Sequence, residues 1–188
     1  MAEGSIHNPI LYLHEYEEVP EEIFYRKNDE ELRPWHAPEK RSAFPPVELL
    51  NVGIGTYKTT EDGEIYLCVL IHPESRKILS YSLGVYRSPR LVGKALENLF
   101  AGGHFDLTLL SSQNPVYRKP EYGKILEKNG VKARMTAKGS RGGVMAVSTF
   151  FSQLMRKKGS YVFRGWQEAI DWLSEYIWNY NCTRSCPE

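Results

Sequence analysis

Two serines, one at the end of a predicted strand and one early in a predicted helix, are the first candidates for chemistry in this sequence. Ser112 ends the apolar run that begins at Leu107, and Ser148 lies early in the helix-like segment Val144–Lys158, with 35 residues between the two serines. A serine acts as a nucleophile when a base such as histidine lies within hydrogen-bond reach. His104, at the start of the same predicted strand, is expected to point away from Ser112. A serine-hydrolase site is therefore not predicted.

Metal or phosphate binding is the other chemistry that short motifs of this chain raise. Cys182 and Cys186 have a metal-like spacing, but no second cysteine or histidine pair accompanies them. Structural zinc needs four ligands. The glycine-rich stretch Gly139–Gly143 lacks the Lys-Ser/Thr ending of a phosphate-binding loop. We therefore expect no metal, no cofactor and no small-molecule substrate.

The composition is that of an ordinary globular protein. The chain has 188 residues, 41% of them hydrophobic and 25% charged, which is enough for one domain and an arm. No apolar run is long enough to span a membrane, and no basic-then-apolar leader opens the chain. Three cysteines are too few for a disulfide framework. These features predict an intracellular protein, in the cytoplasm or the nucleus, without membrane contact.

Positive charge is concentrated in one segment. Residues 113–164 hold 12 basic and 2 acidic side chains, whereas residues 1–50 hold 5 basic and 11 acidic ones. Such a basic block indicates a surface that faces phosphate groups. At a helix end, a solvated position favoured by the helix dipole is the alternative. The residues that we expect to contact nucleic acid are Lys119, Lys138, Arg141, Arg156, Lys157 and Lys158.

The order of the predicted elements indicates the fold class. Three strands come first, at Leu49–Lys58, Glu64–His72 and Lys77–Tyr86, joined by short turns. Ser88 and Pro89 are predicted to start a helix that runs to Phe100. The remaining predicted elements are the strand Leu107–Ser112, the helix Lys119–Asn129, the strand Val131–Thr136 and the helices Val144–Lys158 and Trp166–Tyr180. This order predicts an α/β, RNase H-like fold with a mixed five-stranded sheet flanked by helices.

The chain is predicted to have three parts. Residues 1–48 form an acidic, proline-rich arm, residues 49–181 the domain, and residues 182–188 a short tail. The arm is either a solvated extension that packs a few aromatic residues on the domain or an acidic cover over the basic block.

Several strings along the domain resemble, in order, the integrase catalytic core of insertion-sequence DDE transposases and retroviral integrases. Ile54–Tyr57 lies where the family has Asp-Ile-Thr-Tyr, and Leu110–Ser112 lies at its His-Ser-Asp. Ala146–Phe151 lies at its Ala-x-Glu-Ser-Phe-Phe, and Tyr180–Arg184 repeats its closing Tyr-Asn-x-x-Arg. The order of these strings and the 35-residue gap make the resemblance specific over residues 33–187.

The resemblance implies a metal site whose ligands are missing. Two divalent ions held by Asp, Asp and Glu activate water and the leaving oxygen in that family. Ile54, Ser112 and Ser148 stand at those positions here. Magnesium is held by anionic oxygens, which these residues do not offer. We expect the three positions to converge without binding Mg²⁺ or Mn²⁺, and no carboxylate nearby to replace them.

These observations predict a catalytically inactive integrase-like domain retained as a DNA-associated binding or assembly module, that is, a degenerate or domesticated transposase core. One alternative is a protein-interaction or dimerisation module that binds no nucleic acid. Its candidate surface is the aromatic helix Trp166–Tyr180, which leaves Trp172 or Trp178 for another surface. The last alternative is an active metal-dependent nuclease or strand transferase with an unconventional site. The expected partners are DNA and a second copy of the chain or another protein.

Overall fold

The structure is a computed structural model that describes residues 49–101, 106–137 and 144–184. The predicted arm and the last residues of the predicted tail lie outside these ranges, as do Lys138 and Arg141. The elements in chain order are β1 Leu49–Lys58, β2 Glu64–Ile71, β3 Ile78–Gly84, α1 Pro89–Phe100, β4 Leu107–Ser111, the 3-10 helix η4 Pro115–Arg118, α2 Pro120–Lys128, β5 Val131–Met135, α3 Met145–Lys158 and α4 Trp166–Cys182.

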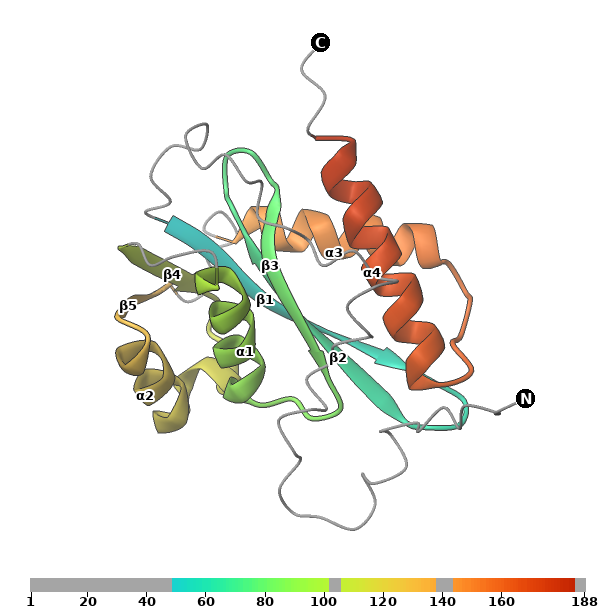
Figure 1. The fold of residues 1–188 in the computed structure, drawn as a ribbon, viewed down its shortest axis with the longest axis horizontal. Helices are drawn as coiled ribbons and strands as arrows, with labels where there is room; N and C mark the ends of the chain where they lie inside the picture. Colours follow the sequence, from blue (N-terminus) through green and yellow to red (C-terminus); the bar gives the residue numbers. More distant parts are fainter. Residues whose placement is uncertain (1–48, 102–105, 138–143, 185–188) are drawn as a thin grey trace, which may run out of the picture.

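The five strands form one mixed sheet in the order β3-β2-β1-β4-β5 (Figure 1). The β1–β2 and β2–β3 pairs are antiparallel, and the β1–β4 and β4–β5 pairs are parallel. This topology confirms the predicted α/β architecture of three hairpin-joined strands followed by alternating helices and strands. No helix in the described ranges is both long enough and apolar enough to cross a membrane.

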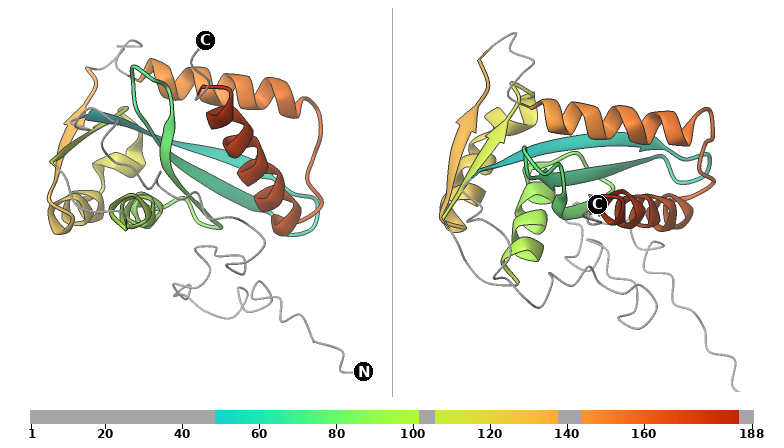
Figure 2. Two further views of the ribbon diagram at one scale, coloured as in Figure 1. Left: turned by 45° about the horizontal axis from the view of Figure 1, so that its top comes forward. Right: turned by 90° about the horizontal axis from the view of Figure 1, so that it is seen from above.

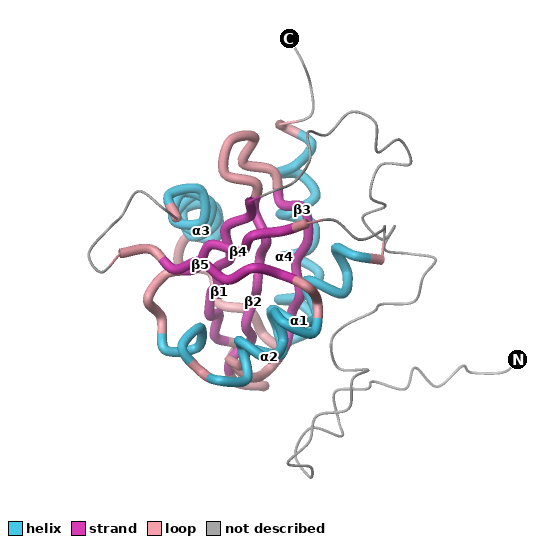
Figure 3. Tube along the Cα trace, turned by 90° about the vertical axis from the view of Figure 1, so that its left-hand side faces the viewer, coloured by secondary structure: helices cyan, strands magenta, loops and turns pink. Residues whose placement is uncertain are grey.

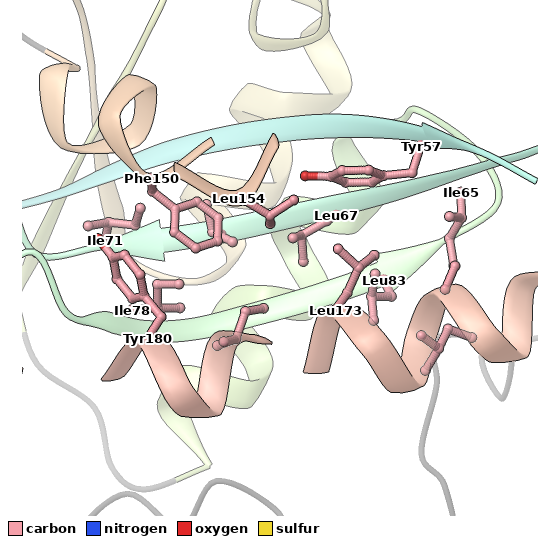
Figure 4. Packing of buried hydrophobic residues seen from close by; sticks show 14 of the residues in the cluster. Tyr57, Ile65, Leu67, Ile71, Ile78, Leu83, Phe150, Leu154, Leu173 and Tyr180 are labelled. Atoms are coloured by element: carbon pink, nitrogen blue, oxygen red, sulfur yellow. The ribbon is translucent and has the colours of Figure 1, made fainter. Parts of the chain in front are cut away.

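Helices cover the sheet on both faces and make two cores. On one face, α1 packs on β2 and β3, and α2 packs beside β5. On the other face, α3 packs on β1 and β2, and α4 on β2 and β3 (Figure 2). In this second core Phe150 and Leu154 of α3 and Leu173 of α4 meet the side chains of the central strands (Figure 4).

The sheet has two unequal halves. In the three-strand half, β1–β3, helices cover both faces. In the two-strand half, β4–β5, the side chains of Leu107, Leu109 and Val131 are buried toward α1 and α2. The side chains that alternate with them are partly or fully exposed, among them Lys132 and Arg134 of β5. β5 lies at the side of the molecule that faces the viewer in Figure 3.

Side-chain amides bind three backbone groups at the outer edge of β3. The Asn181 Oδ1 accepts a hydrogen bond from the Ile78 N–H at 3.0 Å, and its Nδ2 donates to the Ile78 carbonyl at 2.8 Å. Asn98 of α1 donates to the Tyr81 carbonyl at 3.1 Å. These bonds hold α4 and α1 to this edge and occupy backbone groups that an edge strand otherwise presents to other chains.

The β1–β2 hairpin is fastened to the linker between α3 and α4. Thr60 N–H donates to the Phe163 carbonyl at 2.9 Å, and Arg164 pairs with Glu61 at 2.6 Å. The Asp62 carboxylate accepts a hydrogen bond from the Trp166 N–H at 2.9 Å. Trp166 is the first residue of α4, so Asp62 caps this helix from a distant part of the chain.

Candidate functional site at the fork between β1 and β4

The three positions of the implied metal site lie around the point where β1 and β4 separate. The two strands pair from Leu49 opposite Thr108 to Asn51 opposite Leu110. We call the region beyond this last pair the fork. Ile54 lies on β1, three residues past Asn51, and Ser112 lies directly after the end of β4, two residues past Leu110.

The third position, Ser148, comes to this region on α3. It directly follows Val147, which packs over Gly53 of β1. Ser148 is exposed, and its hydroxyl donates to the Val144 carbonyl at 3.3 Å. Ile54 instead packs against the core under α1 and α2, because strand alternation turns its side chain away from α3. The three positions therefore surround one fork but occupy two faces of the sheet.

Apolar side chains fill the contact between β1 and α3. A Cβ atom at Gly53 would lie 2.2 Å from Cγ1 of Val147, and one at Gly55 would lie 2.5 Å from Cε1 of Phe151. Only glycine admits the helix at this distance. The β1–α3 contact is therefore a closely packed apolar one, without oxygen atoms that could hold a divalent ion.

The polar groups that remain at the fork are neutral. Asn51 and Ser111 are buried, and the Asn51 Oδ1 has no hydrogen-bond partner among the described residues. Two of the carboxylates that could have replaced the missing ligands are engaged elsewhere: Asp62 caps α4, and Glu121 pairs with Arg90 at 3.5 Å. Across the described ranges, no group of three or more His, Cys, Asp or Glu side chains could hold a metal ion.

The pKa shifts of the buried tyrosines and of the buried cysteine keep these side chains neutral. Burial raises the pKa of Tyr57, Tyr122 and Cys68, and also raises the pKa of Tyr117 well above its ordinary value. A thiol that stays protonated and fully buried is unreactive. Hydrogen bonds from the Tyr161 hydroxyl and the Arg164 N–H lower the pKa of the partly exposed Glu168. The bond from Arg164 ties the linker to the first turn of α4. These shifts do not prepare an acid or a base for chemistry near neutral pH.

Two separate groups of exposed basic residues bear on the predicted nucleic-acid surface. Lys132 and Arg134 are exposed on one face of β5, and we call them the β5 patch. Lys119, which precedes α2, is also exposed. Arg156 and Lys157 are exposed in the last turn of α3. Arg156 lies eight residues after Ser148, or about 12 Å along the helix axis. The basic block of the sequence is therefore not one continuous face.

Lys158, one of the predicted nucleic-acid contacts, is partly buried. Its Nζ donates to the Tyr161 carbonyl and lies 5.5 Å from the centroid of the Phe163 ring. Lys132 and Arg134 were not among the predicted contacts. The signal that could have found them is their alternation along a predicted strand, which places both on one face.

No protein-family model matches the sequence. The insertion element IS600 uncharacterized 31 kDa protein of Shigella sonnei is 29% identical over 125 residues, which are 65% of this chain and 46% of that protein. The chain thus spans less than half the length of this curated relative.

Solved structures agree with the topology. The catalytic domain of Mos1 mariner transposase matches with a TM-score of 0.55 and 14% identity over 69% of each chain. A chain of the simian T-cell lymphotropic virus intasome, in complex with PP2A regulatory subunit B56 gamma, matches with a TM-score of 0.54 and 12% identity. This match covers 74% of the present chain and 50% of the intasome chain. The described part of the chain therefore has the RNase H-like fold of transposase and retroviral integrase catalytic cores.

Proposed function

We propose that this chain is a transposase-like core that has lost metal-dependent strand transfer and serves as a DNA-associated binding or assembly module. The observation that carries the proposal is the composition of the fork. Ile54, Ser112 and Ser148 offer no anionic oxygen, and Val147 packs directly on Gly53. Without carboxylates to hold them, divalent ions cannot activate water or stabilise the leaving oxygen.

Charge and similarity support the DNA-binding part of the proposal. The β5 patch is exposed beside the fork, and Arg156 and Lys157 add a second exposed group. A structurally similar protein, Mos1 transposase, has been solved as a paired-end complex with the left transposon end. Lysine and arginine side chains bind duplex DNA by neutralising phosphates and releasing counterions.

Metal titration tests the catalytic part. We expect no saturable binding of Mn²⁺ or Mg²⁺ by calorimetry and no metal-dependent nicking of plasmid DNA by the purified chain. The triple variant Ile54→Asp, Ser112→Asp, Ser148→Glu should be less stable than the wild type without metal, because the aspartate at 54 would replace a side chain that packs against the core under α1 and α2. Metal-dependent nicking by the wild-type chain that persists through further purification would refute the proposal.

Binding to duplex DNA over a range of salt concentrations tests the second part. Each phosphate contact contributes about 0.9 to the slope of log affinity against log salt, so Lys132→Ala with Arg134→Ala should make the slope shallower by about 1.8. Arg156→Ala with Lys157→Ala tests the other exposed group in the same way. Lys124→Ala with Lys128→Ala removes the same charge from α2 and serves as the control. Binding that does not change with salt would contradict phosphate contact.

A protein-interaction module is the second candidate function, and one observation favours it. Trp178 on α4 is 59% exposed, whereas Trp172 is partly buried and stacks on Tyr176 at 5.6 Å. A large exposed tryptophan is a common anchor of protein interfaces. If this surface mediates self-association, Trp178→Ala should abolish dimers in sedimentation. A wild-type chain that stays monomeric at high concentration would exclude self-association through this surface.

A further inference from the structure

The outer edge of β5 presents free backbone groups in a regular pattern. Just after the strand, the Thr136 N–H donates to the Ser111 carbonyl at 2.9 Å, toward β4. Neighbouring residues of a strand direct their backbone groups to opposite edges. Val131, Ala133 and Met135 therefore direct theirs away from β4. Within the described ranges, no hydrogen bond reaches this edge from another element.

The side chains of this edge strand differ between its two faces. Lys132 and Arg134 are exposed on the face that α3 shares, opposite the face into which Val131 is buried. Ala133 and Met135 are exposed on the side of Val131. A strand that pairs here would fit best with acidic residues on one face and an apolar or aromatic residue on the other.

The arm contains one segment with that alternation. In residues 11–18, Glu15 and Glu17 flank Tyr16, and Pro9 and Pro20 bound the segment on either side. We propose that residues 11–18 of the same chain pair with the free edge of β5 as a sixth strand, with Tyr16 opposite Ala133. In a parallel or an antiparallel arrangement, the two glutamates then lie opposite Lys132 and Arg134.

The distances allow this pairing within one chain. The arm joins the domain at Leu49, the start of β1, and only β4 lies between β1 and β5. A sixth strand outside β5 would lie three strand spacings from β1, about 14 Å. Residues 19–48 provide a linker of 30 residues, and a proline-rich linker of this length reaches well beyond that distance. A tether of this kind gives an effective concentration near millimolar, so even weak pairing is populated.

The other occupants of this edge make different predictions. Charge on an edge strand can by itself prevent unwanted pairing, in which case nothing binds. A second copy could supply its own arm, and DNA could contact Lys132 and Arg134. Strand pairing itself requires no nucleic acid. Only its consequence, competition between the arm and DNA, depends on the proposed function.

Hydrogen exchange on the full chain tests the pairing. In the wild type, the Ala133 and Met135 amides should exchange at least about tenfold more slowly than in the variant Glu15→Lys, Glu17→Lys. Combining that variant with Lys132→Glu and Arg134→Glu should restore protection, because the opposite charges face each other again. Glu21→Lys with Glu22→Lys changes the same charge outside the segment and should have no effect. Wild-type amides that exchange as fast as the variant's would overturn the proposal.

Disulfide trapping separates one chain from two. Tyr16→Cys and Ala133→Cys are introduced together into a chain in which Cys182 and Cys186 are replaced by serine. Oxidation at low concentration should give a cross-linked species with the mass of one chain. A cross-link found only between chains would overturn pairing within the chain and assign the edge to a second copy.

DNA affinity is then compared between the Glu15→Lys, Glu17→Lys variant and the Glu21→Lys, Glu22→Lys control. Higher affinity of the first supports competition, whereas equal affinities with confirmed pairing leave the sixth strand in place and refute DNA contact at this edge.

Discussion

The three-strand and two-strand halves of the sheet differ in how completely the fold uses their polar groups and faces. In the three-strand half, helices cover both faces, and Asn98 and Asn181 occupy the outer edge of β3. In the two-strand half, one face is exposed in part, and the edge of β5 carries Lys132 and Arg134. Substitutions in the first half should therefore change stability, and exposed substitutions in the second should change binding.

Alkaline pH should have the largest effect on stability and should test whether the two halves unfold together. Burial raises the pKa of Tyr57, Tyr117 and Tyr122, so the unfolded chain loses these protons first. Stability is therefore complete below about pH 10 and falls as the pH rises further, by about 1.4 kcal/mol per tyrosine at pH 11 and about 4 kcal/mol for the three. Urea unfolding at a series of pH values measures this loss.

Substitutions of single tyrosines show which of them cause the loss of stability at alkaline pH. Tyr57→Phe, beneath α3, and Tyr122→Phe, on α2, should each reduce the alkaline loss by one tyrosine's share. Absorbance of tyrosinate provides the second measurement. If Tyr122 ionised near its ordinary pKa while Tyr57 stayed neutral, the two-strand half would open separately, and the halves would not form one cooperative unit.

Asn181→Ala should have the next largest effect. The change leaves the Ile78 N–H and carbonyl without the side-chain partners that they have in the fold. Two buried groups without partners cost about 2–4 kcal/mol together. Asn179→Ala, at an exposed position of the same helix, is the control and should change stability little. Equal effects of the two changes in urea denaturation would show that the β3 edge is not held by Asn181.

Paired glycine substitutions compare the halves directly. Gly53→Ala places a Cβ atom 2.2 Å from Val147 and should destabilise the chain by about 1–3 kcal/mol. Gly123→Ala on α2 meets no atom within 4 Å and should stabilise it by about 0.5–1 kcal/mol. Thermal unfolding of both variants measures the difference. A neutral Gly53→Ala variant would mean that α3 can move away from β1 at little cost.

Lys132→Ala with Arg134→Ala should have the smallest effect on stability. Both side chains are exposed, and exposed substitutions usually change the free energy of unfolding by less than about 0.5 kcal/mol. The same variant should lose affinity for DNA. A large loss of stability would show that these side chains support the fold.

Much of the fold could be predicted because local signals agree with the final packing. The apolar run of β2 is buried almost throughout, and the strand ends at Ile71, one residue before the predicted end. Pro89 begins α1 as predicted, with Ser88 as its N-cap residue. The helix predicted at 119–129 begins one residue later, at Pro120, with Lys119 as its N-cap residue. Periodicity and capping residues are local properties, so the sequence carries them without knowledge of the fold.

The candidate site was less predictable because it depends on contacts between distant residues. The sequence shows that Gly53 is a glycine, but only the packed helix shows that Val147 fills the space above it. The basic residues are close in sequence, yet α3 carries Arg156 and Lys157 away from the β5 patch. Most of the predicted contacts lie in or beside the glycine-rich stretch and on α3, whereas Lys132 and Arg134 of the edge strand are not among them.

The cap of α4 has a consequence for the order of folding. The Trp166 N–H donates to the carboxylate of Asp62, which lies 104 positions earlier in the sequence. The helix is therefore capped only after the hairpin and the linker before α4 have met, and loop-closure entropy delays such a contact. Losing a cap of about 1 kcal/mol through Asp62→Ala should raise the unfolding rate about fivefold and leave the folding rate nearly unchanged. We therefore expect the Asp62 carboxylate to affect the lifetime of the native state more than the rate of folding.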